Sequence, residues 1–136
     1  MDLDRALLVS AAGMAAQSAR LRVVAENLAN RDTTGDRPGA DPYRRKTVTF
    51  ASRLDQEAGV QTVRVGRVGT AAGEFPERYQ PSHPAADERG YVRTPNVDSF
   101  VEVMDMREAQ RGYGANLSVL ETTRSMLMRT IEALRG

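Results

Sequence analysis

The chain lacks several residue types on which many enzymes and secreted domains depend. Its 136 residues include no cysteine, no tryptophan and a single histidine, His83. Without cysteine, a disulfide framework, a thiolate nucleophile and a cysteine-based zinc site are all excluded. Aromatic residues make up only 5% of the sequence, so little of the large buried area that they give a compact enzyme is available.

Charge of one sign and long apolar runs are also scarce. The formal net charge is +1, which argues against a strongly basic nucleic-acid-binding protein and against an acidic tail. No run of about 18 apolar residues occurs, so we expect no membrane span. The start, MDLDRALLVSAAGMAA, has acids where a signal peptide has basic residues. We therefore expect no cleaved signal peptide, and another export route if the protein works outside the cytoplasm.

A long amphipathic pattern is present at the N-terminal end. From Asp4 to about Ala29, a leucine or methionine recurs every seven residues with a small residue four positions after it, which predicts one helix with an apolar stripe. The stripe consists of Leu7, Ala11, Met14, Ser18, Leu21, Ala25 and Leu28. We expect a partner helix to approach closely over the small residues Ala11, Ala15, Ser18, Ala19 and Ala25. An ordinary core helix fits this pattern equally well.

A second such pattern fills the C-terminal end. Ser99 with Glu102 three residues later fits a capping box and predicts the helix start. Heptad positions are Met106, Tyr113, Leu120, Leu127 and Leu134, with Ala109, Asn116, Thr123 and Thr130 between them and Val103, Leu117 and Ile131 widening the stripe. Gly112 and Gly114 indicate a bend or a close contact. Near the end, Met126, Met128 and Ile131 add apolar side chains on more than one face, and this surplus favours contacts with other molecules.

The middle of the chain predicts a small β-rich and irregular segment. It holds all six prolines. The stretches KTVTF and VQTVRVGRVG alternate apolar and polar residues and predict strands, and Tyr91 and Val92 predict a short one. The predicted fold is therefore α+β, with long terminal helices paired as a coiled-coil-like hairpin. We expect residues 1–30 and 97–136 to form a terminal-helix domain and residues 31–96 to form the β-rich segment.

Candidate chemistry is sparse. His83 could act as a base oriented by Asp87, but no nucleophile motif accompanies it and a structural role in a turn fits better. Metal ligands are too few. The glycines of VGRVGTAAG do not have the spacing of a phosphate loop. We expect the basic stretch YRRK, and the acids Glu102, Asp105 and Glu108, to form solvated surface. No catalytic, cofactor-binding or metal-binding residue is predicted.

Two stretches resemble the bacterial flagellar rod and hook proteins. The first, SAAGMAAQSARLRVVAENLANRDTTG, is similar to the N-terminal motif of that family. The second, PSHPAADERGYVRTPNVDSFVEVMDMREAQRGYGANLSVLETTRSM, is similar to its proximal-rod members. The family usually has an aromatic residue where Asp36 stands, and glutamate where Gly114 stands. The motif positions are Gly13, Gln17, Asn27, Asn30, Thr33, Gly90, Tyr91, Pro95, Asn96 and Asn116.

The resemblance implies a structural subunit of the proximal rod, the drive shaft in the periplasmic part of the flagellum, exported by the flagellar type III system. It implies that Asn27, Asn30 and Thr33 end the first helix and hold the loop after it. Implied partners are FlgB-, FlgF- and FlgG-like rod subunits, the junction protein FliE, the export apparatus and further copies of the chain, in a helical assembly. Expected assembly residues are Leu7, Met14, Leu21, Leu28, Met106, Tyr113, Leu120, Leu127, Ile131 and Leu134. The alternatives are an FlgB-like subunit, a small enzyme that uses His83, and a helical-hairpin adaptor for protein or nucleic acid.

Overall fold

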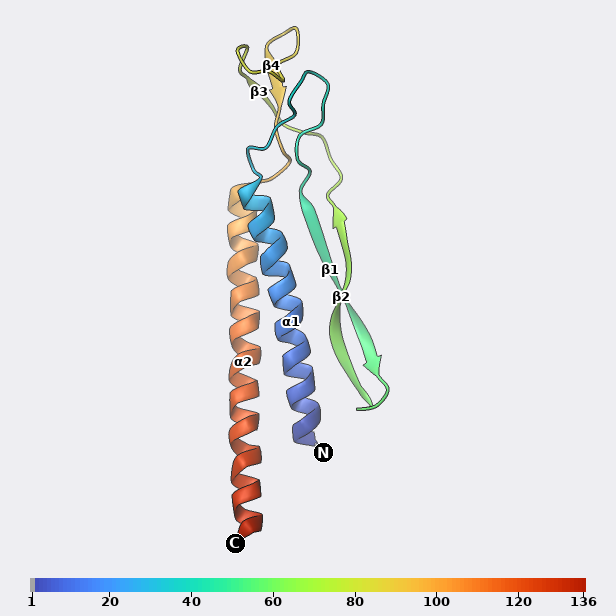
Figure 1. The fold of residues 1–136 in the computed structure, drawn as a ribbon, viewed down its shortest axis with the longest axis vertical. Helices are drawn as coiled ribbons and strands as arrows, with labels where there is room; N and C mark the ends of the chain where they lie inside the picture. Colours follow the sequence, from blue (N-terminus) through green and yellow to red (C-terminus); the bar gives the residue numbers. More distant parts are fainter. Residues whose placement is uncertain (1) are drawn as a thin grey trace. The chain divides into compact units, whose positions relative to one another are not determined.

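The computed structural model describes residues 2–136. In chain order its elements are α1 (Asp2–Ala29), β1 (Lys46–Asp55), β2 (Val60–Thr70), β3 (Glu77–Tyr79), β4 (Tyr91–Arg93) and α2 (Ser99–Arg135) (Figure 1). The predicted α+β class is confirmed, with a long helix at each end and two-stranded sheets between them. The expected strands are also present, and β1 runs further than predicted, to Asp55. In the described part of the chain, neither helix is long and apolar enough to cross a membrane.

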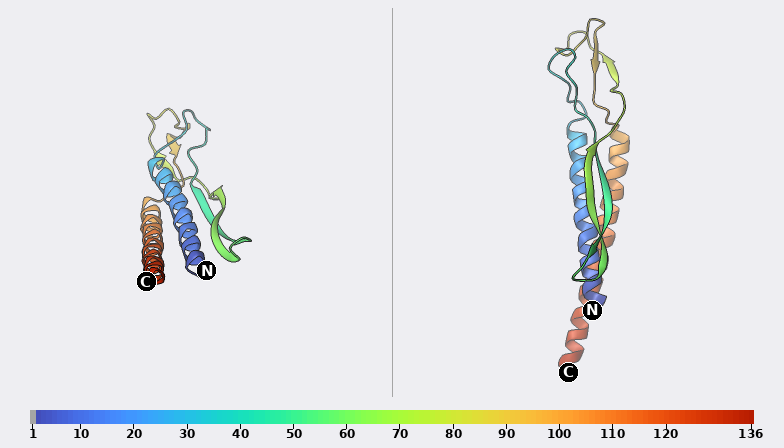
Figure 2. Two further views of the ribbon diagram at one scale, coloured as in Figure 1. Left: turned by 60° about the horizontal axis from the view of Figure 1, so that its bottom comes forward. Right: turned by 90° about the vertical axis from the view of Figure 1, so that its right-hand side faces the viewer.

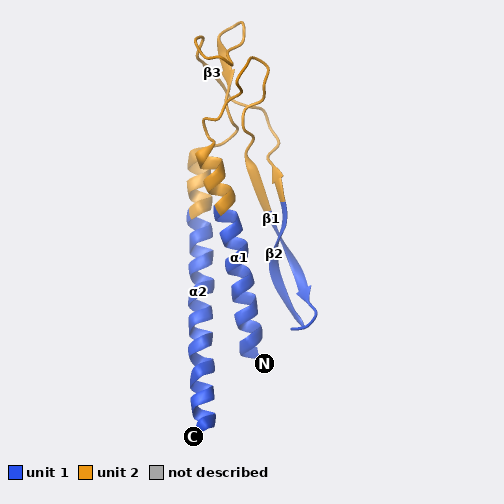
Figure 3. Ribbon diagram, viewed as in Figure 1, with its two compact units in different colours: residues 1–21, 49–67, 107–136 blue, residues 22–48, 68–106 orange. Residues whose placement is uncertain are grey.

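Two compact units divide the chain (Figure 3). Unit 1 comprises residues 1–21, 49–67 and 107–136, and unit 2 comprises residues 22–48 and 68–106. Both helices and the β1–β2 hairpin contribute residues to each unit.

In unit 1, α1 and α2 lie side by side in opposite directions (Figures 1 and 2). Gly13 lies against Asn116, whereas Arg20, two turns later on α1, pairs with Glu108 at 3.7 Å. Residues later on α1 therefore meet residues earlier on α2. The hairpin runs along α1 and lies nearer to α1 than to α2 (Figures 1 and 2). Such a hairpin is marginally stable alone, so this packing supports it.

The buried line along α1 differs from the predicted stripe. Ser10, Ala12, Gly13 and Ala16 are buried, whereas the heptad leucines and methionine are half-buried. The small residues expected to admit the partner helix are instead exposed at Ala11, Ala15, Ser18 and Ala25 and half-buried at Ala19, so that prediction was wrong. The reason is that the smallest side chains occupy the line of closest approach. The larger heptad side chains are left at its margins.

The predicted capping box at the start of α2 is also wrong. The cap is Asp98, whose Oδ1 accepts a hydrogen bond from the Phe100 amide at 2.9 Å and whose carbonyl accepts from the Glu102 amide at 3.0 Å. Asp98 thus serves as the acidic N-cap that helices favour. The Glu102 side chain is directed to other partners, described below.

Unit 2 has its apolar centre at the β3–β4 pair. The strands are antiparallel with Arg78 opposite Val92 and Tyr79 opposite Tyr91, and Val92 is fully buried. The two tyrosine rings meet edge to face with centroids 5.3 Å apart. Gly90 precedes β4 with φ +86°, and a Cβ there would lie 2.8 Å from the Tyr79 ring, so both conformation and space require glycine.

Candidate assembly surface and its polar anchor

A polar anchor in unit 2 joins the end of α1 to β1 and to the start of α2. Its hub is the buried Asn27. The Asn27 Oδ1 accepts hydrogen bonds from the Tyr43 hydroxyl at 2.7 Å and from the Lys46 amide at 2.9 Å. Its Nδ2 donates to the Lys46 carbonyl at 2.9 Å and to Glu102 Oε2 at 3.3 Å. All the hydrogen-bonding capacity of one amide is used, so Asn27 acts as a tertiary cross-link.

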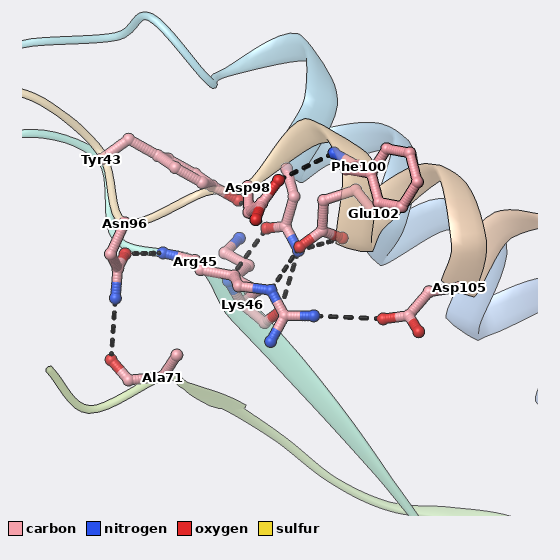
Figure 4. Close-up of polar contacts among 10 residues, drawn as sticks. Tyr43, Arg45, Lys46, Ala71, Asn96, Asp98, Phe100, Glu102 and Asp105 are labelled. Carbon is pink, nitrogen blue, oxygen red and sulfur yellow. Dashed lines mark hydrogen bonds and ion pairs between the residues drawn. The ribbon is translucent and has the colours of Figure 1, made fainter.

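The carboxylate of Glu102 is the charged centre of the anchor (Figure 4). It is fully buried and pairs with Arg45, whose Nη2 also donates to Asp105 Oδ2 at 3.1 Å. A buried carboxylate is tolerated only when it is paired and hydrogen-bonded. The expectation that Glu102 and Asp105 lie on a solvated face is therefore wrong, whereas the Glu108 side chain is exposed.

The basic stretch YRRK is the other half of this anchor rather than solvated surface. The Arg45 amide donates to Asn96 Oδ1 at 2.8 Å, and Asn96 Nδ2 donates to the Ala71 carbonyl at 3.4 Å (Figure 4). Lys46 Nζ lies 2.5 Å from Glu26 Oε1, and this hydrogen bond raises the Lys46 pKa above its usual value. Burial, followed by the nearby Glu26 charge, raises the pKa of Tyr43.

Asn30 and Thr33 terminate α1. Asn27 does not do so, because its side chain is the hub of the anchor. The Asn30 amide and its Nδ2 both donate to the Glu26 carbonyl, at 3.1 and 2.9 Å. The Thr33 hydroxyl donates to Asn30 Oδ1 at 3.0 Å, and the Thr33 amide donates to the Asn30 carbonyl at 3.1 Å. These bonds turn the chain out of the helix, as Asn and Thr commonly do.

His83 has a turn-forming environment. Its Nδ1 accepts a hydrogen bond from the Ala85 amide at 2.9 Å, and its Nε2 lies 3.2 Å from the Thr34 hydroxyl. Asp87 accepts from the amides of Arg89 and Tyr91, each at 2.9 Å, and the bond from Tyr91 is the main cause of its lowered pKa. Within residues 2–136, no cluster of three potential metal ligands of the types His, Cys, Asp and Glu occurs.

The C-terminal end of α2 carries a cluster of uncovered apolar side chains. Figures 1 and 2 show that α2 continues past the N-terminal end of α1. Near the C-terminal end of α2, Leu134 is 83% exposed, and Met126, Met128 and Ile131 are about half exposed. We call these four residues the terminal patch. Among the expected assembly residues, Ile131 and Leu134 are thus exposed, and Leu7, Met14, Leu21, Leu28, Met106, Tyr113, Leu120 and Leu127 are half-buried.

A second exposed apolar cluster, which the sequence analysis missed, lies at the start of α2 in unit 2. Phe100 is 76% exposed, and Val101, Val103 and Met104 are each at least 40% exposed. The available signal was an apolar residue on both sides of Glu102. The interpretation of that stretch as a capping box followed by a single apolar stripe does not predict these exposed side chains.

The motif positions fall into two groups. Asn27, Asn30, Thr33, Gly90, Tyr91, Pro95 and Asn96 lie in unit 2, around the anchor and β4. Gly13, Gln17 and Asn116 lie in unit 1, where α1 meets α2. The motifs thus supply contacts within each unit.

Comparison with known proteins first defines the class. Residues 7–35 match the family model described as flagella basal body rod protein, and residues 88–133 match the model described as flagellar basal body rod FlgEFG protein C-terminal. These two matches cover most of α1 and of α2. The chain is therefore a protein of the flagellar basal-body rod class. Its two terminal helices, which have surplus apolar surface, are the parts that match.

Full-length relatives then identify the family. A protein of Agrobacterium fabrum is 50% identical over 134 residues, covering 98% of this chain and 96% of the relative. Relatives from Salmonella typhimurium and Aquifex aeolicus are 41% and 39% identical, covering 90% and 98% of this chain and 91% and 98% of their own lengths. Each is named flagellar basal-body rod protein FlgC. The chain belongs to the FlgC family of flagellar basal-body rod proteins, and these names favour this type over an FlgB-like subunit.

Proposed function

We propose that this chain is a non-catalytic structural subunit of the proximal part of the flagellar rod, built into the rod through its two terminal helices. The observation that carries the proposal is the terminal patch, where apolar side chains at the end of α2 have no cover in the described chain. Burying such surface is favourable by roughly 25 cal/mol per Å². Membership of the FlgC family supports the flagellar rod as the assembly that supplies the cover.

The helices suit an open assembly. The terminal patch and the half-buried stripe of α1 are different surfaces, so contact between one on a subunit and the other on its neighbour is heterologous. Heterologous contacts extend into helical arrays when they do not close into rings. In this proposal residues 1–30 and 97–136 form the packing domain of the rod, and residues 31–96 form its β-rich outer part.

The partners in this proposal are other rod subunits. They comprise FlgB-, FlgF- and FlgG-like proteins, the junction protein FliE and further copies of this chain. Export would use the flagellar type III apparatus without cleavage of a signal peptide. The non-catalytic role is supported by the engagement of His83 and Asp87 in separate turn contacts.

The proposal is tested by removing the chromosomal gene and complementing with Leu134→Asp. Leu134 is mostly exposed, so a charge there should leave the fold intact while preventing apolar contact with a neighbour. We expect the deletion strain to lose swimming and rods, the unchanged gene to restore both, and Leu134→Asp to be exported without restoring either. Measurements are a swimming assay, electron microscopy of basal bodies and immunoblotting of exported protein.

Leu134→Met is the matched control, because it keeps an apolar side chain of similar volume, and it should restore swimming. Full swimming of the deletion strain would overturn the rod assignment. Normal rods in the Leu134→Asp strain would overturn the role of the terminal patch while leaving the rod assignment in place.

A further inference from the structure

Two glycines in unit 1 lie directly against side-chain amides of the opposite helix. A Cβ at Gly13 of α1 would lie 2.7 Å from Asn116 Nδ2 and 2.9 Å from Asn116 Cγ. A Cβ at Gly112 of α2 would lie 2.8 Å from Gln17 Nε2 and 3.0 Å from Gln17 Cδ. Any other residue at either glycine would displace the amide. Each helix therefore supplies one glycine and, four residues later, one amide.

Burying the side-chain amide of Gln17 lowers the stability of the folded chain. Its Oε1 is buried without a hydrogen-bond partner, whereas Asn116 Nδ2 donates to the Gly112 carbonyl at 2.9 Å. A buried acceptor without a partner loses its bonds to water and gains nothing in exchange. A methionine of similar shape at this position would avoid that loss, so stability alone does not explain a glutamine at this position.

Within unit 1 the apolar packing of the two helices does not by itself specify one register, whereas in unit 2 the Asn27–Glu102 hydrogen bond opposes a slide. The large apolar residues of both helices recur every seven positions, and the buried line between them consists of small side chains such as Ala12, Ala16 and Ala109. A seven-residue slide would match the large residues again. It would also replace Gly112 by Val119 opposite Gln17, where the amide has no room.

We propose that the Gly13–Asn116 and Gln17–Gly112 pairs set the register of α1 against α2 within unit 1, in addition to the Asn27–Glu102 hydrogen bond of unit 2, and that Gln17 provides this specificity at a cost in stability. A single polar residue in a helix interface is a known means of fixing register. Register decides how far α2 extends beyond α1, and hence whether the terminal patch is uncovered. Only this last consequence rests on the proposed function.

Crosslinking reads the register directly, because the chain has no cysteine of its own. Arg20 and Glu108 are paired at 3.7 Å, so Arg20→Cys with Glu108→Cys reports the observed register. Arg20→Cys with Ala115→Cys reports a slide of one heptad. Each pair is treated with a short bis-maleimide in the dilute full-length chain, and the crosslinked monomer is quantified. Gln17→Met is then added to both pairs, with Gly114→Ala as the control because nothing lies within 4 Å of a Cβ at Gly114.

We expect the first pair to dominate in the parent and in Gly114→Ala. In Gln17→Met the ratio of the two crosslinks should fall by about tenfold, which is about 1.4 kcal/mol of register preference, while the melting temperature stays equal or rises. Asn116→Leu tests the second pair in the same way. Equal ratios in parent and Gln17→Met, a lower melting temperature of Gln17→Met, or dominance of the shifted crosslink in the parent would overturn the proposal.

The consequence for assembly is measured separately in the complemented deletion strain. Gln17→Met should be exported and should reduce swimming, and Gly114→Ala should swim normally. Normal swimming of a strain whose purified protein has lost its register would overturn that consequence. The rod assignment would still be judged by the deletion strain itself.

Discussion

At the residue scale, the buried carboxylate of Glu102 makes unit 2 dependent on Arg45. We expect Arg45→Met to lower the free energy of unfolding by about 3 kcal/mol or more, because it leaves a buried charge unpaired. Urea unfolding of the purified chain measures this. The control is Arg89→Met, which removes a cation paired with Asp87 and Glu77 at the surface. That exposed interaction is worth at most about 1 kcal/mol, so equal losses in the two variants would contradict the assigned role of the anchor.

Tyr43 makes the stability of unit 2 depend on pH in the alkaline range. Burial raises the Tyr43 pKa above its usual value of 10.0, so the folded state holds the phenolic proton more tightly than the unfolded state does. This contribution is complete below pH of about 10 and is lost as pH rises through the raised pKa. The raised pKa of Lys46 acts in the same direction.

We therefore expect the unfolding free energy to fall less steeply above pH of about 10 in Tyr43→Phe than in the parent. At neutral pH the variant should be about 1 kcal/mol less stable, because the hydrogen bond to Asn27 is lost. Urea unfolding at several pH values measures both effects. Parallel pH profiles of parent and variant would show that Tyr43 does not titrate differently in the folded state.

At the scale of elements, three glycines in the helices have separable roles. Gly114→Ala adds a methyl group into open space and should stabilise the chain by about 1 kcal/mol through helix propensity. Gly13→Ala makes the same gain in propensity but brings a Cβ within 2.7 Å of the short Asn116 side chain, so it should destabilise. Gly112→Ala should fall between them, because the longer Gln17 side chain can move. Thermal unfolding followed by circular dichroism gives the order, and a rise in stability for Gly13→Ala would contradict the close contact.

At the scale of the whole molecule, assembly should complete the packing of α2. The C-terminal end of α2 extends past the start of α1 (Figure 1), and a helix end without packing is marginal in water. We expect the amides of residues 128–136 to exchange rapidly with solvent in the dilute monomer and to be protected in isolated rods, while amides near Ala109 are protected in both. Hydrogen exchange followed by mass spectrometry measures this. Strong protection of residues 128–136 in the monomer would mean that the terminal patch needs no neighbour.

The sequence by itself determined the elements of this protein. Heptad spacing at both ends, β-branched alternation in the middle and the position of every proline specified two helices and two strand regions, because these signals are local. The uncovered end of α2 was also predictable, since apolar residues on several faces exceed what one partner helix can cover. Two motif stretches in the sequence alone indicate the family.

Only the tertiary structure decided which residues meet. Glu102 was expected at the surface but lies buried against Arg45. The two residues are far apart along the chain, so no local pattern indicates that they pair. The predicted stripe of α1 was rotated from the buried line, because closest approach selects alanine and glycine over leucine, and their position depends on the partner helix. The sequence left open whether Gly112 marks a bend or a close contact. The structure shows a close contact with Gln17, a residue of the other helix. Local pattern fixes what each segment becomes, whereas long-range packing and the need to pair buried charge fix the contacts.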